Sequence, residues 1–215
     1  MNEIFLIGSG GHAKVVLDAM IAANCKPHGI IDNDPDKLES LLLGVTVIGD
    51  DNIFFNRFSP NDAKVVVGIG SVRSTKIRNQ VYQLYNQRGY KFLNVIHPYA
   101  KISQYCQLQN SIQILANVTV NAGSVIGNNS ILNTGSTIDH DCVIGNSVHI
   151  APGVTLSGNV RIGDDTHIGT GAIVIQNISI GKNCLIGAGS VVLNNVPDNS
   201  VVVGCPARVI KKNEI

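Results

Sequence analysis

A repeat of period six dominates the second half of this chain of 215 residues. Every sixth position from Ile102 to Val192 is Ile, Leu or Val, and no insertion breaks the register. Four residues after each of these positions lies a second register, from Cys106 to Val196, in which no residue is charged or large. A period of six fits neither the 3.6 residues of a helical turn nor the simple alternation of a half-buried strand, so it predicts a solenoid.

The position directly after each aliphatic residue is rich in Gly, Asn and Asp, as at Gly127, Asn133 and Asp139. These residue types tolerate positive φ, so we predict that each hexad is a short strand with a sharp corner at this position. The pattern resembles the hexapeptide repeat of the left-handed parallel β-helix, in which three hexads form one triangular coil. The resemblance, and not the spacing, implies the left hand, because crossovers between parallel strands are normally right-handed. Sixteen hexads give about five coils, in a prism about 25 Å long.

The N-terminal part has the order of a nucleotide-binding βαβ unit. An apolar run at residues 3–7 leads into Gly8-Ser9-Gly10-Gly11-His12-Ala13, a helical stretch at 14–23, a second apolar run at 28–31 and then Asp32. Gly8, Gly10 and Ala13 satisfy the G-x-G-x-x-G/A spacing, in which glycine lets a phosphate approach the backbone at a helix N-terminus. A tight strand-to-helix turn without a ligand is the alternative interpretation.

Further apolar runs at 45–48, 64–69 and 91–96, with an amphipathic stretch at 75–88, complete a Rossmann-like parallel sheet of four or five strands. We therefore predict an α/β nucleotide-sugar-binding domain at residues 1–97 and a left-handed β-helix domain with a C-terminal cap at 98–215. In the cap we expect a last strand at 201–203, a closing loop at 204–208 and a tail. The first domain is too short for the two halves of a dinucleotide fold, which favours a mononucleotide or nucleotide sugar over NAD.

Charge and hydropathy narrow the class of protein. The chain has 16 Lys and Arg against 15 Asp and Glu, with no basic cluster before its last residues, which argues against a nucleic-acid partner. It has no apolar run of 18 residues and no signal-peptide layout at its start, so we expect a cytoplasmic protein without membrane insertion. Its five cysteines form no Cys-x-x-Cys pair, and we expect reduced thiols.

His140 is the side chain of the repeat best suited to chemistry. It comes two residues after the inward Ile138, which places it outside the prism, between Asp139 and Asp141. A neighbouring carboxylate raises the proton affinity of an imidazole and fixes its tautomer, as a general base near neutral pH requires. An exposed histidine among acids without any role is the alternative.

Two other chemistries are disfavoured. His149 and His167 are one coil apart and stack on one face, but His140 is out of phase with them, so we predict no metal. Cys142 lies beside His140, but its register points it into the coil, so we do not expect a nucleophilic thiol.

Four motifs together resemble one bacterial family: the Gly8–Ala13 loop, Asn133-Thr134-Gly135-Ser136, the block from Asp139 to Gly145, and Gly204-x-Pro-Ala-Arg208. This family contains the UDP-4-amino-sugar N-acetyltransferases that make N-acetylbacillosamine-type sugars, and the sialic acid O-acetyltransferases. The resemblance implies a homotrimer that transfers acetyl from acetyl-CoA, bound between adjacent prisms, to the 4-amino group of a UDP-4-amino-4,6-dideoxy sugar.

The resemblance also implies site residues. His140 matches the catalytic base and Asp141 its acidic partner, which is often Glu in the family. The residues implied to bind the UDP-sugar are Gly10, Gly11, His12, Asp32, Asn33, Gly70 and Asn133. Those implied to bind acetyl-CoA are His149, Gly158, Thr170, Ala188 and Arg208, with the backbone N–H of Gly158 at the oxyanion. The alternatives are O-acetylation of sialic acid, a non-catalytic scaffold for sugar biosynthesis, and an NAD-binding protein.

Overall fold

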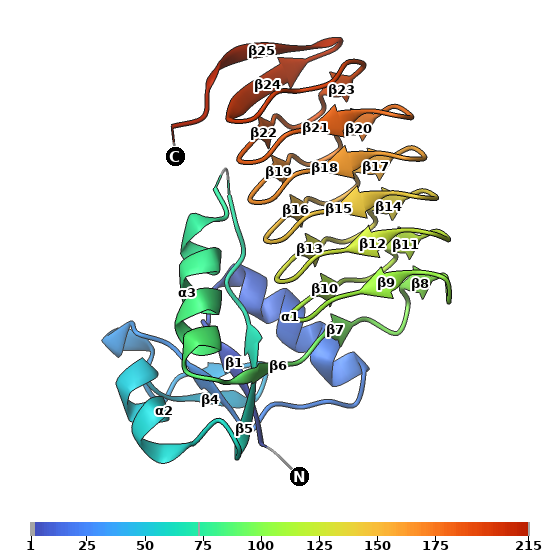
Figure 1. Cartoon of the computed structure of the whole chain (residues 1–215). Helices are drawn as coiled ribbons and strands as arrows, with labels where there is room; N and C mark the ends of the chain where they lie inside the picture. Colours follow the sequence, from blue (N-terminus) through green and yellow to red (C-terminus); the bar gives the residue numbers. More distant parts are fainter. Residues whose placement is uncertain (1–2, 73, 215) are drawn as a thin grey trace.

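The computed structural model describes residues 3–72 and 74–214 and has two parts (Figure 1). An α/β layer forms the N-terminal part, and a prism of short stacked strands forms the rest. The predicted fold class, a parallel α/β sheet followed by a left-handed parallel β-helix, is confirmed.

The N-terminal sheet has the strand order β3-β4-β2-β1-β5-β6 and is parallel except where β3 pairs with β4. It has six strands because the short β3, which the sequence pattern did not predict, is added at one edge. The strands are β1 (Glu3–Ile7), β2 (Gly29–Ile31), β3 (Leu41–Leu42), β4 (Val45–Gly49), β5 (Ala63–Val67) and β6 (Lys91–Phe92). The helices are α1 (Gly11–Ala22), α2 (Asp51–Arg57), α3 (Lys76–Gln87) and the 3-10 helix η1 (Pro35–Lys37).

The predicted single strand at 91–96 is wrong, because the chain changes domain within it. β6 pairs with β5 in the N-terminal sheet, whereas β7 (Val95–Ile96) belongs to the solenoid and pairs with β10 of the next coil. Asn94, between them, donates to the carbonyl of Gln109 at 2.8 Å and accepts from the N–H of Ile112 at 2.9 Å. Ile96 lies six residues before Ile102, so the repeat begins one hexad earlier than the first clear aliphatic register.

The prism has three faces, each a parallel sheet in which strands of successive coils pair 18 residues apart, as His149 does with His167. Face 1 contains β7, β10 (Gln113–Ile114), β13 (Ile131–Leu132), β16 (His149–Ile150), β19 (His167–Ile168) and β22 (Leu185–Ile186). Face 2 contains β8 (Lys101–Ile102), β11 (Thr119–Val120), β14 (Thr137–Ile138), β17 (Thr155–Leu156), β20 (Ile173–Val174) and β23 (Val191–Val192). Face 3 contains β9 (Gln107–Leu108), β12 (Val125–Ile126), β15 (Val143–Ile144), β18 (Arg161–Ile162) and β21 (Ser179–Ile180).

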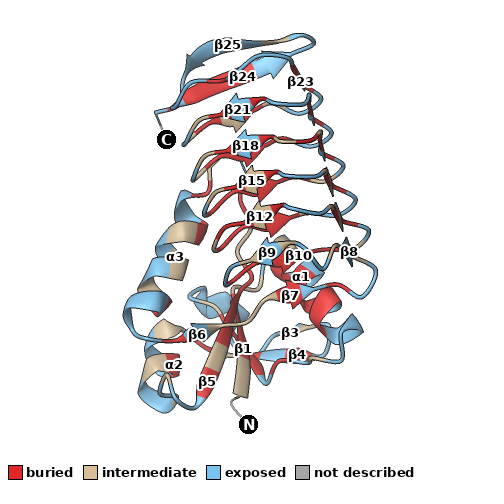
Figure 2. Cartoon of the chain, turned by 45° about the vertical axis from the view of Figure 1, so that its right-hand side comes forward, coloured by how far each residue is buried: buried red, intermediate tan, exposed pale blue. Residues whose placement is uncertain are grey.

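The two registers fill the interior of the prism (Figure 2). The aliphatic register is buried from Ile114 to Val192, and the small register supplies hydroxyl groups that bridge successive coils. Ser124 Oγ donates to the carbonyl of Asp139 at 2.8 Å and accepts from the N–H of Cys142 at 3.1 Å. Thr166 makes the same pair of bonds one column away, to Gly181 and Cys184. The small polar residues therefore satisfy backbone groups that the corners would otherwise leave unpaired.

The prediction that the residue directly after each aliphatic position takes positive φ is wrong. Positive φ occurs two residues later, as at Asp141 (φ 60°) and Asn159 (φ 55°). The first position favours glycine for a different reason, namely the close stacking of coils. A Cβ atom on Gly127 would lie 2.5 Å from the backbone of Gly145 in the next coil, so no side chain fits.

The C-terminal segment forms a hairpin on top of the prism. β24 (Ser200–Gly204) continues face 1 by pairing with β22, and β25 (Ala207–Lys212) pairs antiparallel with β24. The expected loop and tail therefore contain a strand that the pattern did not predict. At the opposite end, Val95 and Leu115 of the first coil share a buried cluster with α1. The N-terminal domain thus packs on the start of the solenoid and along face 1 (Figure 1).

Candidate functional site

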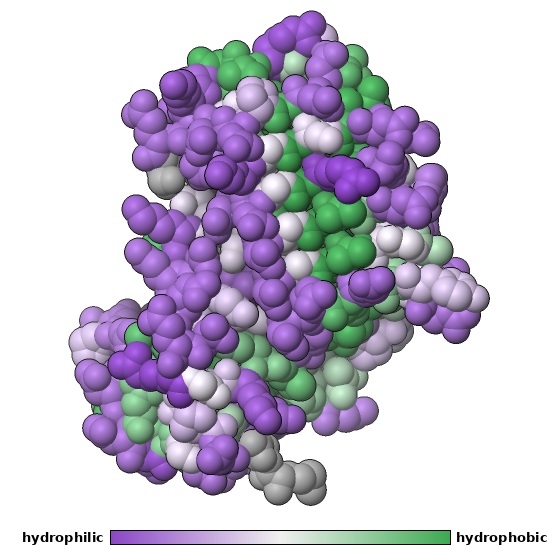
Figure 3. All heavy atoms as spheres, viewed as in Figure 1, coloured by the Kyte–Doolittle hydropathy of each residue, from purple (hydrophilic) through white to green (hydrophobic). Residues whose placement is uncertain are grey.

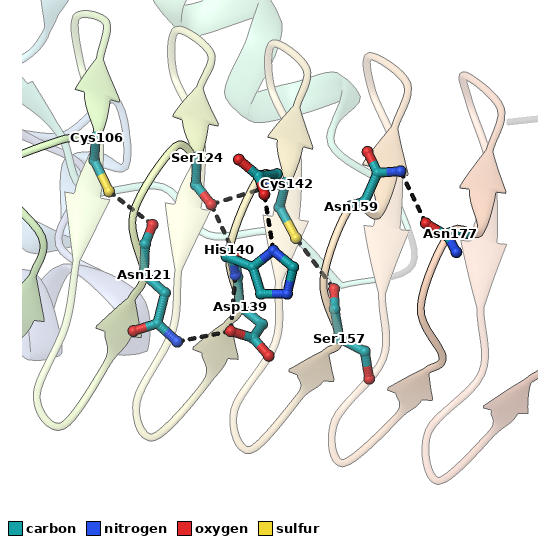
Figure 4. Close-up of polar contacts among 10 residues, drawn as sticks. Cys106, Asn121, Ser124, Asp139, His140, Cys142, Ser157, Asn159 and Asn177 are labelled. Carbon is teal, nitrogen blue, oxygen red and sulfur yellow. Dashed lines mark hydrogen bonds and ion pairs between the residues drawn. The ribbon is translucent and has the colours of Figure 1, made fainter.

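His140 lies on the edge between face 2 and face 3, in the turn that joins β14 to β15. We call this edge 2–3. Its side chain is 51% exposed, because Asp141 at the corner turns the chain with positive φ and leaves the imidazole outside. Figure 4 shows the ring beside Asp139 and outside the ladder of hydroxyl and thiol groups that includes Ser124 and Cys142. The expected position outside the prism is therefore the position in the structure.

Two carboxylates hold His140, one through its ring and one through its backbone N–H. His140 Nδ1 lies 2.8 Å from Asp141 Oδ2, and since an ionised carboxylate only accepts, Nδ1 donates. Asp139 Oδ1 accepts from the backbone N–H of His140 and from Asn121 Nδ2, both at 2.8 Å. The hydrogen bond to Asp141, helped by the charge of Asp139, raises the pKa of His140. The arrangement leaves Nε2 as the atom that can accept a proton.

Gly158 lies one coil beyond His140 and borders its ring. A Cβ atom at position 158 would lie 2.5 Å from His140 Cε1 and still closer to Nε2. Among residues 3–72 and 74–214, no group accepts a hydrogen bond from the N–H of Gly158. Because position 158 has no side chain, the ring of His140 can lie directly against the backbone there, with Nε2 next to a backbone donor.

A cavity of about 750 Å³ lies where the N-terminal domain meets the edge between face 1 and face 2, which we call edge 1–2. It is bounded by the glycine loop and α1 on one side and by the turns after β13 and β16 on the other. The structure brings together here all seven residues implied to bind the UDP-sugar and also His149, which the resemblance assigns to acetyl-CoA. They are Gly10, Gly11, His12, Asp32, Asn33, Gly70, Asn133 and His149.

The start of α1 is suited to bind an anion. Its N-cap Gly10 has no capping side chain, and no acidic residue lies in the first turn. Cβ atoms on Gly10 and Gly11 would meet nothing within 4 Å, so packing does not require glycine there. The first backbone N–H groups of the helix therefore face a space that a phosphate can enter.

Two imidazoles line the same cavity in their neutral form, that of His149 buried and that of His12 half-buried. His149 Nδ1 donates to the carbonyl of Ser71 at 3.0 Å and lies 2.6 Å from its hydroxyl, and Nε2 accepts from Asn133 at 3.1 Å. His12 Nε2 lies 2.7 Å from Gln113 Oε1 and donates to it. Burial lowers the pKa of His149 well below its usual value and lowers the pKa of His12 to about 4. Both histidines are thus fixed hydrogen-bonding groups at neutral pH.

Asp32 occupies the position at which dinucleotide folds bind a ribose, but its carboxylate is already engaged. Its Oδ2 accepts from the N–H and the hydroxyl of Ser9 at 2.7 and 2.5 Å, and its Oδ1 accepts from the N–H of Asp34 at 3.0 Å. Hydrogen bonds from Ser9 and Asp34 outweigh its partial burial and lower the pKa of Asp32. Asp32 thereby fixes the glycine loop against the end of β2.

The other residues implied to bind acetyl-CoA form two groups. Gly158 lies beside His140 on edge 2–3. Thr170 and Ala188 are exposed on edge 1–2 in the same column as Thr134 and Pro152, which line the cavity. Arg208 lies in β25 of the C-terminal hairpin, where it pairs with Val203 of β24. Face 2 separates the two groups within one chain, and their assignment to the coenzyme remains a prediction.

Sequence reasoning missed several residues of the cavity, among them Ser71 and Asp51. A signal for Ser71 existed, since it follows the apolar run of β5 and the carboxyl ends of parallel strands commonly border ligand sites. Among residues 3–72 and 74–214, no group of three or more His, Cys, Asp or Glu is placed to hold a metal. Within the same ranges, none of the helices has the length and hydropathy needed to cross a membrane.

Comparison with known families agrees with this geometry. Residues 3–85 match the family described as PglD N-terminal domain. Residues 123–158 and 159–194 each match the family described as bacterial transferase hexapeptide (six repeats).

Solved structures match the whole chain. PerB from Caulobacter crescentus, in complex with CoA and GDP-perosamine, is 33% identical over 98% of each chain, with a TM-score of 0.89. The acetyltransferase domain of PglB from Neisseria gonorrhoeae, in complex with acetyl coenzyme A, is 36% identical over 98% of this chain and 100% of that one, with a TM-score of 0.89. WeeI from Acinetobacter baumannii is 27% identical over 98% and 100%, with a TM-score of 0.85.

The fold, the cavity and these similarities define an acyltransferase of the hexapeptide-repeat class with acetyl-CoA as cosubstrate. More narrowly, the chain belongs to the family of bacterial sugar acetyltransferases that join a PglD-type N-terminal domain to a left-handed β-helix. The family expected from the sequence motifs is therefore confirmed.

Proposed function

We propose that this enzyme acetylates the 4-amino group of a UDP-4-amino-4,6-dideoxy sugar by direct transfer from acetyl-CoA, with His140 as the general base. One observation carries the proposal: the exposed imidazole, held through Nδ1 by Asp141, has Nε2 next to the backbone of Gly158, whose N–H donates to no partner among the described residues. A base in this position accepts the proton of an amine as its nitrogen attacks a thioester.

The chemistry divides among three groups. His140 Nε2 takes the proton from the attacking nitrogen, and Asp141 stabilises the imidazolium that forms. We propose that the N–H of Gly158 donates a hydrogen bond to the oxyanion of the tetrahedral intermediate. In other enzymes one such donor lowers the activation free energy by about 3 kcal/mol. Cys142 takes no part, because it is buried and its thiol donates to the carbonyl of Ser157 at 3.2 Å.

The cavity supports a nucleotide-sugar acceptor. The uncapped start of α1 suits a diphosphate, and Asn133 and His149 lie where the sugar would extend toward the solenoid. Perosamine N-acetyltransferase from Caulobacter crescentus binds GDP-perosamine, which shows that a relative takes a nucleotide amino sugar. For this chain we propose that the nucleotide of the acceptor is UDP. The alternative to be tested is GDP.

We further propose a homotrimer that completes the site. Within one chain the cavity on edge 1–2 and His140 on edge 2–3 lie on opposite sides of face 2. Large apolar side chains are exposed in the upper coils of this region, at Ile173, Ile175 and Leu193. Figure 3 shows a hydrophobic band on the side of the β-helix where Figure 1 labels β12, β15 and β18 of face 3, whereas the surface over α3 is mostly hydrophilic. Association would bring edge 2–3 of one prism to edge 1–2 of the next, with acetyl-CoA between them.

We propose a cytoplasmic location, because acetyl-CoA and nucleotide sugars are substrates of the cytoplasm. We also propose the division into two domains, with the boundary moved from residue 97 to about residue 94, because β7 already pairs with β10 in the solenoid.

The test is thiol release from acetyl-CoA with a panel of UDP- and GDP-linked 4-amino sugars, with sialic acid in a parallel assay. We expect release with a UDP-4-amino sugar and a product carrying an N-acetyl group by mass spectrometry. Replacement of His140 by Ala should reduce the rate at least 100-fold, the lower end of typical general-base contributions. Release with sialic acid alone would refute N-acetylation, and an unchanged rate in the alanine variant would refute the base.

A further inference from the structure

The guanidinium of Arg78 lies between the two domains and is nearly inaccessible, with 1% of the residue exposed. Arg78 belongs to the first turn of α3, and its side chain passes behind the loop that follows β5. Residues 68–71 of that loop form one wall of the cavity proposed for the nucleotide sugar. Arg78 itself does not line the cavity.

Three backbone carbonyls accept hydrogen bonds from this guanidinium. Its Nη1 donates to Val67 at 2.8 Å and to Ile69 at 2.7 Å, and its Nε donates to Asn129 of the solenoid at 3.1 Å. Val67 is the last residue of β5, so Arg78 clamps both ends of the bend from which the cavity wall starts. It also ties this bend to the prism.

A second side chain holds the same bend. Gln113 of the first coils donates from Nε2 to the carbonyl of Val67 at 2.5 Å and accepts from His12 at 2.7 Å. The wall after β5, the start of α1 and the prism are thus connected through Val67. A Cβ atom on Gly70 would lie 2.9 Å from the side chain of His12, so the two walls also touch.

The charge of Arg78 has no counter-charge in the described structure. Among residues 3–72 and 74–214, no carboxylate lies within 4.0 Å of its nitrogens, and the buried Nη2 has no hydrogen-bond partner. Burial lowers the pKa of Arg78 to about 9, so the group is still protonated at neutral pH. Its charge also contributes to the lowered pKa values of His12 and His149, both of which line the cavity. An unpaired buried cation is costly and needs compensation.

We propose that Arg78 is a positioning residue for the acceptor: it shapes the wall at residues 68–71 and supplies, from behind it, the positive charge that a nucleoside diphosphate neutralises. The inference rests on the proposed function, since it requires an anionic ligand in this cavity. The diphosphate would contact the backbone N–H groups of α1 and not the guanidinium. Arg78 then acts on the ligand through its electrostatic field and by holding residues 68–71 in place.

The experiment compares ligands that differ only in charge. Calorimetry measures the affinity of uridine, UMP and UDP, with guanosine, GMP and GDP in parallel, for the wild type and for Arg78→Met and Arg78→Lys. Methionine keeps the length of the side chain and removes the charge, whereas lysine keeps the charge and loses the planar fork. Lys76→Met removes an exposed charge from the same helix and serves as the matched control.

We expect Arg78→Met to weaken the binding of the nucleoside diphosphate about tenfold more than the binding of the nucleoside, because the lost charge attracts only the ligand that carries phosphates. Arg78→Lys should recover most of this difference while both ligands stay weaker than with the wild type, because the wall is held less well. KM for acetyl-CoA should not change. Lys76→Met should match the wild type throughout. Equal losses for nucleoside and diphosphate in Arg78→Met would overturn the electrostatic role.

A measurement on the wild type keeps the proposal testable if Arg78→Met does not fold. The 15Nε resonance of Arg78 should shift when UDP or GDP is added and much less when the nucleoside is added. An Arg78 resonance that does not respond to a bound diphosphate would overturn the inference alone. A wild type that binds neither UDP nor GDP would instead overturn the proposed nucleotide-sugar acceptor.

Discussion

Gly158→Ala separates the proposed catalytic geometry from the stability of the fold. The backbone of Gly158 does not have positive φ, so alanine fits it without strain. The three atoms nearest to the added methyl group all belong to the ring of His140, which is exposed and can move. The free energy of unfolding should therefore stay within about 0.5 kcal/mol of the wild type.

The magnitude of the effect on catalysis follows from the contact distance. The new Cβ atom would lie 2.5 Å from His140 Cε1. Carbon atoms settle at about 3.5 Å or more, so the imidazole must move by roughly 1 Å. A misplacement of this size costs on the order of 100-fold in rate, and we expect kcat/KM to fall by about this factor.

The assay is thiol release at saturating acetyl-CoA with the acceptor varied, for Gly158→Ala, His140→Ala and the double variant. If the methyl group acts by displacing the imidazole, it has nothing left to displace once His140 is alanine. The double variant should then be as active as His140→Ala, which is a strongly non-additive result. Multiplicative losses, or full activity in Gly158→Ala, would refute the reasoning.

Three further predictions concern pH and the solenoid. Because our proposal makes the neutral imidazole of His140 the base, kcat/KM should fall as pH drops below the raised pKa of His140, and Asp141→Asn should move this limb to lower pH while reducing kcat; an unmoved limb would assign it to another group. His167 is neutral and buried in the fold, with a pKa lowered to about 4 from 6.5, so the unfolded chain binds its proton first and stability should decrease from about pH 6.5 down to 4. His167→Leu, which continues the column formed by Leu185 in the next coil, should flatten this decrease in urea titrations, and an equally steep decrease would contradict the assignment. Ile150→Ala should lower the free energy of unfolding by about 2–5 kcal/mol without changing KM, measured by denaturant unfolding, and a loss below 1 kcal/mol would show that the prism interior is loosely packed.

The sequence predicts the solenoid well because its period is tied to its geometry. Each strand pairs with the strand 18 residues later, so an insertion or a shift by one residue would turn the apolar side chains of that coil away from the interior. The same logic places His140 outside and Cys142 inside. The pattern does not show contacts between coils. For this reason it predicts positive φ at Gly127, whereas the structure needs glycine there because the next coil packs too closely for a side chain.

The cavity was only partly predictable. The glycine loop is a local motif and gave Gly10, Gly11 and His12, whereas the meeting of Ser71 with His149 joins residues 78 positions apart. The engagement of Asp32 with Ser9 depends on a hydroxyl that the motif leaves free to vary. The sequence pattern does not predict strand β25, because nearly all of its residues are exposed and form no apolar face. The strand forms by pairing with β24.

The hairpin of β24 and β25 determines how long the solenoid can be. A stack of parallel coils presents the same hydrogen-bonding edge at each level, and an open edge would invite a second molecule to add to it. On face 1 the antiparallel return of β25 replaces the parallel edge with a strand that carries Arg208, Lys211 and Lys212, while the N-terminal domain packs on the start of the solenoid. End-to-end addition of a second molecule is thereby disfavoured on face 1, whereas faces 2 and 3 end at β23 and β21.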